Sequence, residues 1–199
     1  RISALAACAA LLVGAGPACA TTGATPATAK INAEAAARLP LQNRQDFDDA
    51  RRGFIATIPD GIIRDLQGKA LYDLKAYDFL LQSDQAPDTV SPGLWRIGQL
   101  NTANGLFKGS ERIDQIRGFD IANMSIIEGE HGLIVIDPLT TQQGAAAGLA
   151  LYYQHRPHKP VTAVIYTHSH ADHFGGIHGV LSDTELSSGK VRIIGPEGF

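Results

Sequence analysis

The sequence predicts an α/β protein in which a helical N-terminal extension precedes a sheet, and three observations support this fold class. Apolar residues recur at helical spacing of three and four in the first hundred residues. From about residue 105 the pattern changes to short β-branched runs separated by glycine-containing turns. A helix-like segment and a buried-strand pattern, Val161–Ile165, then lead directly into a dense group of candidate metal ligands.

Length and composition limit the possible classes of function. The chain has 199 residues, of which 44% are hydrophobic and 19% charged, so most of it can bury a core. The formal net charge is −3 and there is no block of basic residues. Because phosphate binding requires clustered Lys and Arg, a nucleic-acid partner is disfavoured.

The first twenty residues have the pattern of an export signal. Arg1 precedes the apolar run Ile2–Val13, and Ala18–Ala20 fits a small-x-small cleavage site. We therefore predict a signal peptide over residues 1–20, a periplasmic or secreted bacterial protein and no stable membrane span, because the run is too short. A buried N-terminal helix is the alternative, and Leu5–Cys8 also resembles a lipoprotein cleavage box, although the apolar run continues past it. Cleavage after Ala20 would remove both cysteines and with them any disulfide.

Residues 21–95 are predicted to form a leader and a helical extension. The leader is rich in Thr, Ala, Pro and Gly, and Asn32 is a suitable N-cap for the helix that follows it. The predicted segments are a flexible leader Thr21–Ala29, helices over Ala33–Leu39, Asp46–Ile58 and Gly68–Gln82, an irregular link Ala86–Gly93, and a docking segment or short helix Leu94–Asn101 containing Trp95.

Residues 96–199 are predicted to form the sheet and the site. The expected strands are Gly105–Lys108, Arg112–Arg117, Ala122–Glu128, Gly132–Ile136, Val161–Ile165 and Val191–Ile194, with a helix over Thr141–Gln154. Three other histidines lie in turns and loops without a partner pattern, and we predict that they are surface residues: His131, His155 and His158.

The metal-ligand prediction rests on His168, His170, Asp172 and His173. In an extended segment His168 and His170 point to the same side, because side chains alternate with period two. Asp172 and His173 lie where the chain turns, so one or both can reach a second cation beside the first. Imidazole and carboxylate without thiolate suit a catalytic zinc site better than a closed structural one. The alternative is a loop of ordinary polar residues, which this density of ligands makes improbable.

This His-x-His-x-Asp-His run resembles the signature of the metallo-β-lactamase superfamily. The resemblance implies an αββα sandwich, of which residues 96–199 would form the first half, with a metal site at the ends of the two sheets.

Further blocks resemble the bacterial alkylsulfatases related to dodecyl sulfate hydrolases, and they cover essentially the whole chain after the leader. They are more specific than the metal motif, which many hydrolases share. The blocks are Gln45–Phe54, Tyr72–Leu80, Ala86–Val90, Leu94–Arg96, Gln99–Asn101, Gly105–Phe107, Gln115–Met124 and Val135–Thr140.

The resemblance implies a zinc-dependent hydrolase that cleaves alkyl sulfate esters to alcohol and inorganic sulfate with a metal-bound hydroxide, by attack at carbon. It implies two zinc ions per subunit, a homodimer when full length, and further C-terminal domains. His168 and His170 would bind the first zinc, while Asp172, also the candidate catalytic residue, and His173 would bind the second. Asp137, at the end of a strand, is expected to orient a ligand rather than to bind metal.

The metal motif also permits other functions. A β-lactamase or a glyoxalase-II-type thioesterase would carry the same metal motif, although without this long helical lead. Both ends of the chain have the character of cuts, so we expect the remaining ligands to lie beyond Phe199. The 199 residues alone would then be an inactive, weakly metal-binding fragment.

Overall fold

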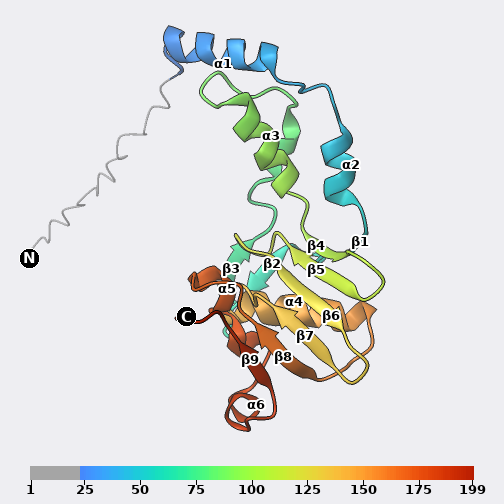
Figure 1. Ribbon diagram of the computed structural model, residues 1–199. Helices are drawn as coiled ribbons and strands as arrows, with labels where there is room; N and C mark the ends of the chain where they lie inside the picture. Colours follow the sequence, from blue (N-terminus) through green and yellow to red (C-terminus); the bar gives the residue numbers. More distant parts are fainter. Residues whose placement is uncertain (1–22) are drawn as a thin grey trace, which may run out of the picture.

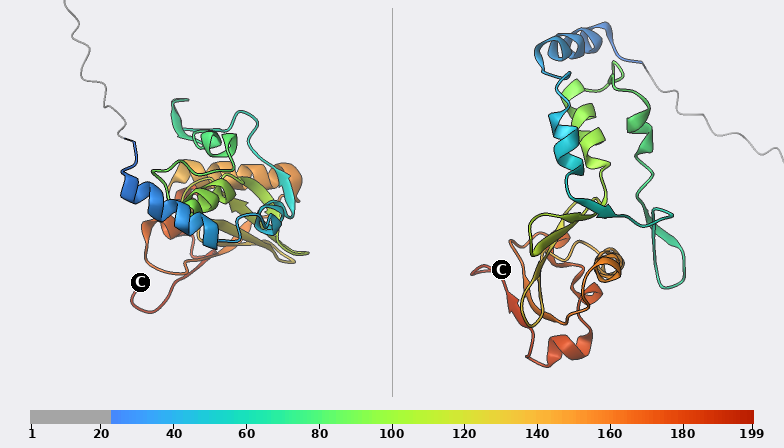
Figure 2. Two further views of the ribbon diagram at one scale, coloured as in Figure 1. Left: turned by 90° about the horizontal axis from the view of Figure 1, so that it is seen from above. Right: turned by 90° about the vertical axis from the view of Figure 1, so that its right-hand side faces the viewer.

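The computed structural model describes residues 23–199, and the predicted signal peptide over residues 1–20 lies outside this range. The chain has two parts, a helical extension and a layered sheet-and-helix unit below it (Figure 1). The right-hand view of Figure 2, turned by 90° about the vertical axis, shows the same separation. No helix in the described residues is long and apolar enough to cross a membrane.

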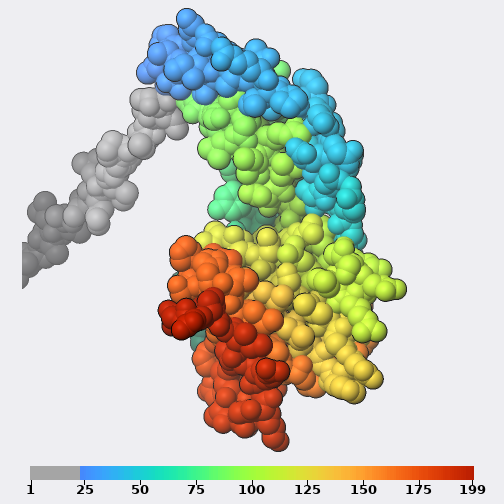
Figure 3. All heavy atoms as spheres, in the orientation of Figure 1, coloured from blue at the N-terminus to red at the C-terminus, as the bar shows by residue number. Residues whose placement is uncertain are grey.

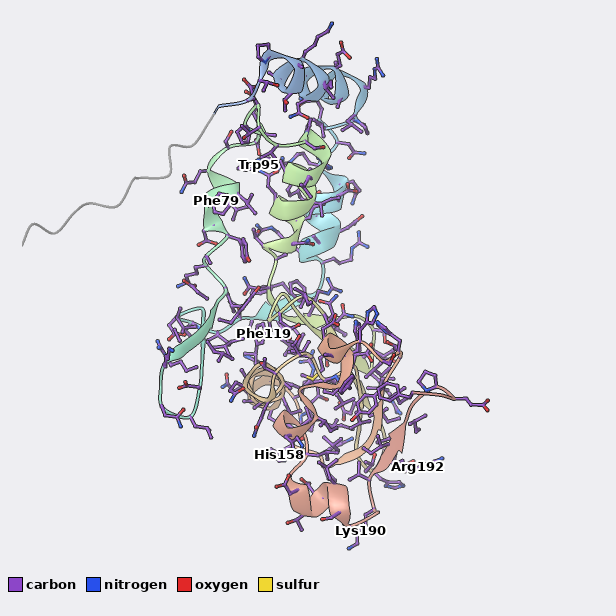
Figure 4. The ribbon with its side chains drawn as sticks, turned by 90° about the vertical axis from the view of Figure 1, so that its left-hand side faces the viewer. Phe79, Trp95, Phe119, His158, Lys190 and Arg192 are labelled. Atoms are coloured by element: carbon purple, nitrogen blue, oxygen red, sulfur yellow. The ribbon has the colours of Figure 1, made fainter. Side chains whose placement is uncertain are left out.

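The helical extension is formed by α1 (Pro26–Arg38), α2 (Gln45–Arg51), the 3-10 helix η1 (Asp78–Gln82) and α3 (Pro92–Asn101). Arg96 of α3 joins these parts, because its guanidinium donates to the carbonyl oxygens of Leu41 and Asn43 and pairs with Asp46. Trp95 packs edge-to-face on Phe79 and donates its indole N–H to the carbonyl of Ser83 (Figure 4). Trp95 is thus a packing residue, as expected.

Two boundaries in the extension differ from the sequence prediction. The first helix begins at Pro26, within the stretch predicted as a flexible leader, and Thr25 rather than Asn32 is its N-cap. The Thr25 hydroxyl accepts a hydrogen bond from the amide of Thr28, and Pro26 occupies the first turn, where its missing N–H does no harm. Asn32 instead donates its side-chain amide to the carbonyl of Asp88.

The predicted helix over residues 46–58 is wrong in its second half. The helix α2 ends at Arg51, and β1 (Phe54–Ala56) then pairs antiparallel with β4 (Gly105–Lys108). Gly53 permits the change because it adopts a positive φ of 76° and a Cβ there would collide with the backbone oxygen of Lys108. Pairing with a distant strand therefore overrides the local helical spacing.

The predicted helix over residues 68–82 is also wrong. Its first part contains β3 (Ala70–Asp73), which forms a hairpin with the preceding β2 (Ile62–Arg64), and its last part contains η1. The Asp65 carboxylate closes the hairpin turn by accepting from the amides of Gln67 and Lys69. This turn chemistry, which a helical count of apolar residues ignores, fixes the hairpin.

The main sheet has seven strands in the order β1-β4-β5-β6-β7-β8-β9. Pairing is antiparallel from β1 to β7 and parallel from β7 to β9. The predicted strands are confirmed, each within two residues of its expected limits. The remaining elements are β5 (Ile113–Arg117), β6 (Met124–Glu128), β7 (Leu133–Ile136), α4 (Gln142–His155), β8 (Val161–Ile165), α5 (Ala171–Phe174), the 3-10 helix η2 (Ile177–Gly179), α6 (Asp183–Ser187) and β9 (Arg192–Ile194).

The core lies between the sheet and α4, which makes the crossover from β7 to β8 as a parallel connection requires. Gly148 allows the helix to approach closely, because a Cβ there would lie 2.9 Å from Met124 Cε and 3.1 Å from Ile116. The fully buried residues on or beside the sheet include Leu106, Ile116, Met124, Ile126, Leu133, Val135 and Val164. The predicted α/β class is confirmed.

The pairing pattern determines where the site lies. β5, β7 and β8 all run in the same direction, since two antiparallel steps separate β5 from β7 and one parallel step joins β7 to β8. The loops that follow these three strands therefore leave the sheet at one edge. They are residues 118–123, 137–141 and 166–170, and the last of them carries the predicted ligands.

Candidate metal centre

The predicted ligand run lies at this edge, immediately after β8. The strand ends at Ile165, the chain continues as a short loop, and α5 begins at Ala171 with His170 as its N-cap residue. The orange and red atoms of the segments after β8 lie at the surface of the layered unit, beneath the green atoms of the extension (Figure 3).

The structure brings the three predicted histidines together. The ring centroids of His168 and His170 are 4.6 Å apart, and those of His168 and His173 are 4.0 Å apart. Oδ2 of Asp172 lies 3.1 Å from Nε2 of His173. His168, Asp172 and His173 are half-buried, whereas His170 is exposed. The four side chains therefore form one cluster that solvent can reach.

Asp137 contacts this cluster through its carboxylate. The residue is buried, and its carboxylate accepts hydrogen bonds from the amide of Thr167 at 2.8 Å and from the hydroxyl of Thr167 at 2.7 Å. Oδ2 of Asp137 also lies 2.9 Å from Nδ1 of His173. Because a carboxylate can only accept, Nδ1 of His173 carries a proton in this contact. Carboxylate–histidine pairs of this kind orient metal ligands.

The loop that carries Asp137 has an unusual backbone. Asp137 and Leu139 have positive φ values of 54° and 62°, in the left-handed region that side chains disfavour. Each such residue costs on the order of 1–3 kcal/mol and persists only where its surroundings enforce it. Here Gly176 donates its amide to the carbonyl of Leu139 at 2.9 Å, and a Cβ on Gly176 would collide with the carbonyl of Pro138. The two glycines after the ligand run thus clamp the loop.

The donor set fits a divalent metal in its chemistry. Imidazole nitrogen and carboxylate oxygen without thiolate are the ligands of catalytic zinc sites. Within residues 23–199, however, no group of three or more His, Cys, Asp or Glu side chains has its donor atoms placed to enclose an ion. At His173, Nε2 contacts Oδ2 of Asp172 directly, at 3.1 Å. Which of the four residues bind metal stays a prediction.

Two hollows of the described structure lie away from this cluster. One, of about 860 Å³, is bordered by η1, α3 and the β5–β6 loop, and its lining includes Phe79, Trp95 and Asp120. The other, of about 640 Å³, lies among α1, α3 and the chain between η1 and α3. Phe119 is buried where the extension meets the layered unit (Figure 4).

Several residues around the ligands were not predicted from the sequence. Thr167, which holds Asp137, precedes the ligand run directly and could have been suspected from that position. Asp120 and the strained backbone at Leu139 have no local signal, because their roles depend on contacts across loops. His131, His155 and His158 are exposed as expected, although His158 also stacks on Tyr153 at 3.9 Å.

Comparison with known proteins extends this picture. Residues 117–199 match the family described as the metallo-beta-lactamase superfamily. The chain is 48% identical over 174 residues to an alkyl/aryl-sulfatase of Saccharomyces cerevisiae, covering 87% of this chain and 27% of that protein. It is also 48% identical over 176 residues to an (R)-specific secondary-alkylsulfatase of Pseudomonas sp, covering 88% of this chain and 26% of that protein.

Solved structures agree with this similarity. The stereoselective inverting sec-alkylsulfatase Pisa1 from Pseudomonas sp. matches with a TM-score of 0.82 and 47% identity, over 89% of this chain and 28% of that one. The chain thus spans about a quarter of the length of the relatives that it matches.

Proposed function

Because this chain belongs to the alkylsulfatase family of the metallo-β-lactamase superfamily, we propose that the whole protein hydrolyses alkyl sulfate esters to an alcohol and inorganic sulfate. One observation carries the proposal. The similarity to alkylsulfatases covers 174 residues, whereas the general superfamily match covers only residues 117–199. The helical extension therefore shares in the resemblance, and other hydrolases of the superfamily are not expected to have it.

The residues of the cluster have distinct parts in this proposal. His168 and His170 would hold one zinc ion, and Asp172 and His173 a second, with Asp172 the candidate catalytic carboxylate. Zinc supplies a Lewis acid that makes water nucleophilic at neutral pH and offsets the negative charge of the departing sulfate. Asp137 fixes the ring of His173 and the backbone of Thr167, so that these groups need not reorganise when substrate arrives.

We propose that water attacks the carbon that bears the sulfate. A relative is described as an inverting sec-alkylsulfatase, and inversion at carbon requires that the carbon–oxygen bond breaks. Hydrolysis by the full-length protein in oxygen-18 water would then place the label in the alcohol. Label in the sulfate instead would mean attack at sulfur.

The test of the function is sulfate release from dodecyl sulfate by the full-length, zinc-loaded protein. His170→Ala removes an exposed imidazole of the cluster and should abolish release with little effect on folding. His178→Ala is the matched control, because His178 is an exposed histidine of η2 that pairs with Asp183 outside the cluster. Release by the control alone would support the proposal. If the wild-type protein binds zinc but releases no sulfate, the proposal fails, and lactam and thioester substrates come next.

Three further parts of the proposal concern the whole protein. We propose that it is exported to the periplasm or secreted, that it forms a homodimer and that it binds two zinc ions per subunit. Cell fractionation, sedimentation velocity and metal analysis test these in turn. The 199 residues alone are expected to be inactive and to bind zinc poorly, since within residues 23–199 no group of three or more ligand side chains is placed to enclose an ion. Turnover by this chain alone would contradict that expectation.

A further inference from the structure

Asp120 joins two of the loops that meet at the edge of the sheet. It follows β5, and its Oδ1 accepts from the amide of Ala122 at 2.8 Å within its own loop. Its Oδ2 accepts from the amide of Thr140, 20 residues later in the chain, also at 2.8 Å. One carboxylate therefore ties the β5–β6 loop to the β7–α4 loop.

Thr140 lies in the strained loop that carries Asp137. The residues on either side of it are constrained, because Leu139 has a positive φ and Thr141 is the N-cap of α4. On the opposite side, Gly175, which follows the ligand run, packs against Thr140. A Cβ on Gly175 would collide with the carbonyl of Thr140. The peptide of Thr140 is thus held between Asp120 and the ligand segment, and it has little room to move independently.

From this arrangement we propose that Asp120 is a positioning residue for the metal ligands. By holding Thr140, it keeps Asp137 and Leu139 in their left-handed conformation, and this conformation directs Asp137 to Thr167 and His173. The inference rests on the metal centre of the proposed function. It adds Asp120, which acts on the candidate ligands indirectly, through Thr140 and Asp137.

A purely local role makes a different prediction. If Asp120 served only to close its own turn with Ala122, its loss would disturb residues 118–123 and the amide of Thr140, and nothing further. If it positions Asp137, the amide of Thr167, which is bonded to Asp137 and not to Asp120, must also lose protection. Hydrogen exchange at Thr167 therefore separates the two roles without metal or substrate.

The experiment compares Asp120→Ala and Asp120→Asn with Asp65→Ala in the full-length protein. Asp65 is a suitable control because it closes the β2–β3 turn with two backbone amides in the same way, far from the ligands along the chain. Hydrogen exchange is followed by mass spectrometry in peptides that contain Thr140 and Thr167, and zinc affinity is measured by competition with a chelator. Asp120→Asn, which keeps the shape of the side chain and one acceptor, serves if the alanine variant does not fold.

We expect both Asp120 variants to exchange faster at Thr167 and to bind zinc about tenfold more weakly, while Asp65→Ala changes neither. Unchanged exchange at Thr167 together with unchanged zinc affinity would overturn the inference. Sulfate release by the wild-type protein is measured separately, so failure of the proposed function is recognised by its absence in a protein that binds zinc.

Discussion

Oδ2 of Asp137 lies 2.9 Å from Nδ1 of His173, although the two residues are 36 positions apart. The strand β7 delivers the carboxylate and the segment after β8 delivers the imidazole, so the contact depends on the parallel pairing of these strands. The same carboxylate accepts twice from Thr167, just before the ligand run. Asp137 is therefore the point at which the sheet fixes the ligand segment.

Asp137→Asn is expected to weaken zinc binding by about 10–100-fold, as is typical when a residue that orients a metal ligand is replaced. The asparagine side chain keeps the shape of the aspartate. Its NH₂ group, however, must face one of the three groups that now contact the carboxylate, which are the amide and hydroxyl of Thr167 and Nδ1 of His173. Zinc affinity is measured by chelator competition in the full-length protein. The control is Asp183→Asn, because Asp183 also pairs with a histidine, His178 at 3.0 Å, but its side chain is 91% exposed. Equal zinc affinity in both variants would contradict the assigned role.

Gly176→Ala is expected to destabilise the protein by at least about 2 kcal/mol, within the range for overpacked sites. The new methyl group would collide with the carbonyl of Pro138 and would lie 2.8 Å from that of Thr141, so backbone must move. Urea unfolding measures the change in the free energy of unfolding. Gly93→Ala is the control, because its nearest neighbour, in the side chain of Leu39, would be at an ordinary 3.8 Å. A Gly176→Ala protein as stable as the control would mean that the loop is not clamped there.

These two sites show how far the sequence could predict the structure. The positions of the strands from β4 to β9 and of the helix between β7 and β8 followed from local patterns, since each of these strands pairs with the next one along the chain. The ligand run was recognisable because four candidate ligands fall within six residues. The place of Asp137 at a strand end could be expected, but its bond to His173 depends on strand register.

The wrong predictions concern segments whose secondary structure depends on contacts with residues elsewhere in the chain. Phe54 has helical spacing with its neighbours, yet it lies in a strand because it pairs with Phe107. Ile63 pairs with Tyr72 in a hairpin that local apolar spacing does not reveal. The left-handed backbone at Leu139 could not be anticipated either, because leucine has no intrinsic preference for it and contacts with distant segments, including Gly175 and Gly176, enforce it.

Tyr152→Phe is expected to reduce the loss of stability at alkaline pH. Burial, reinforced by Glu128 and Asp114, raises the pKa of Tyr152 to about 12, whereas an unfolded tyrosine titrates near 10. Between about pH 10 and 12 the unfolded state holds fewer protons, so the free energy of unfolding falls as pH rises. The stabilisation that comes from the raised pKa of Tyr152 is fully present below about pH 10 and is lost as the pH approaches about 12. Urea unfolding at pH 8 and at pH 10.5 measures the difference.

The same variant makes a prediction at pH 8. The Tyr152 hydroxyl is buried and has no hydrogen-bond partner among the described residues. Its removal should therefore leave stability unchanged or raise it by about 1 kcal/mol. Tyr77→Phe is the control, since Tyr77 is half exposed. Burial also raises the pKa values of Tyr72, Tyr153 and Tyr166, so part of the alkaline decline remains in the variant. An unaltered decline would show that Tyr152 is not its source.

Asp114→Asn is expected to destabilise the protein by about 2–3 kcal/mol without changing zinc affinity. The Asp114 carboxylate accepts two hydrogen bonds from Arg156, at 2.8 and 2.9 Å, and its side chain is only 6% exposed. Breaking a fully buried pair costs about 3–5 kcal/mol. We expect about 2–3 kcal/mol here because the Arg156 side chain is 26% exposed. Urea unfolding and chelator competition give the two quantities. A change in zinc affinity would reveal coupling between the ends of the sheet.

The order of the strands has a consequence for how the chain acquires its structure. From β4 to β7 every pairing is between consecutive strands and is closed by a short turn, so these contacts can form quickly. β8 must wait for the crossover through α4, because a longer loop has to close before it can pair. We expect pulse-labelling exchange to protect β5 and β6 before β8. The histidines would then arrive at a surface that already presents Asp137, and metal capture would be the last event of folding rather than its trigger.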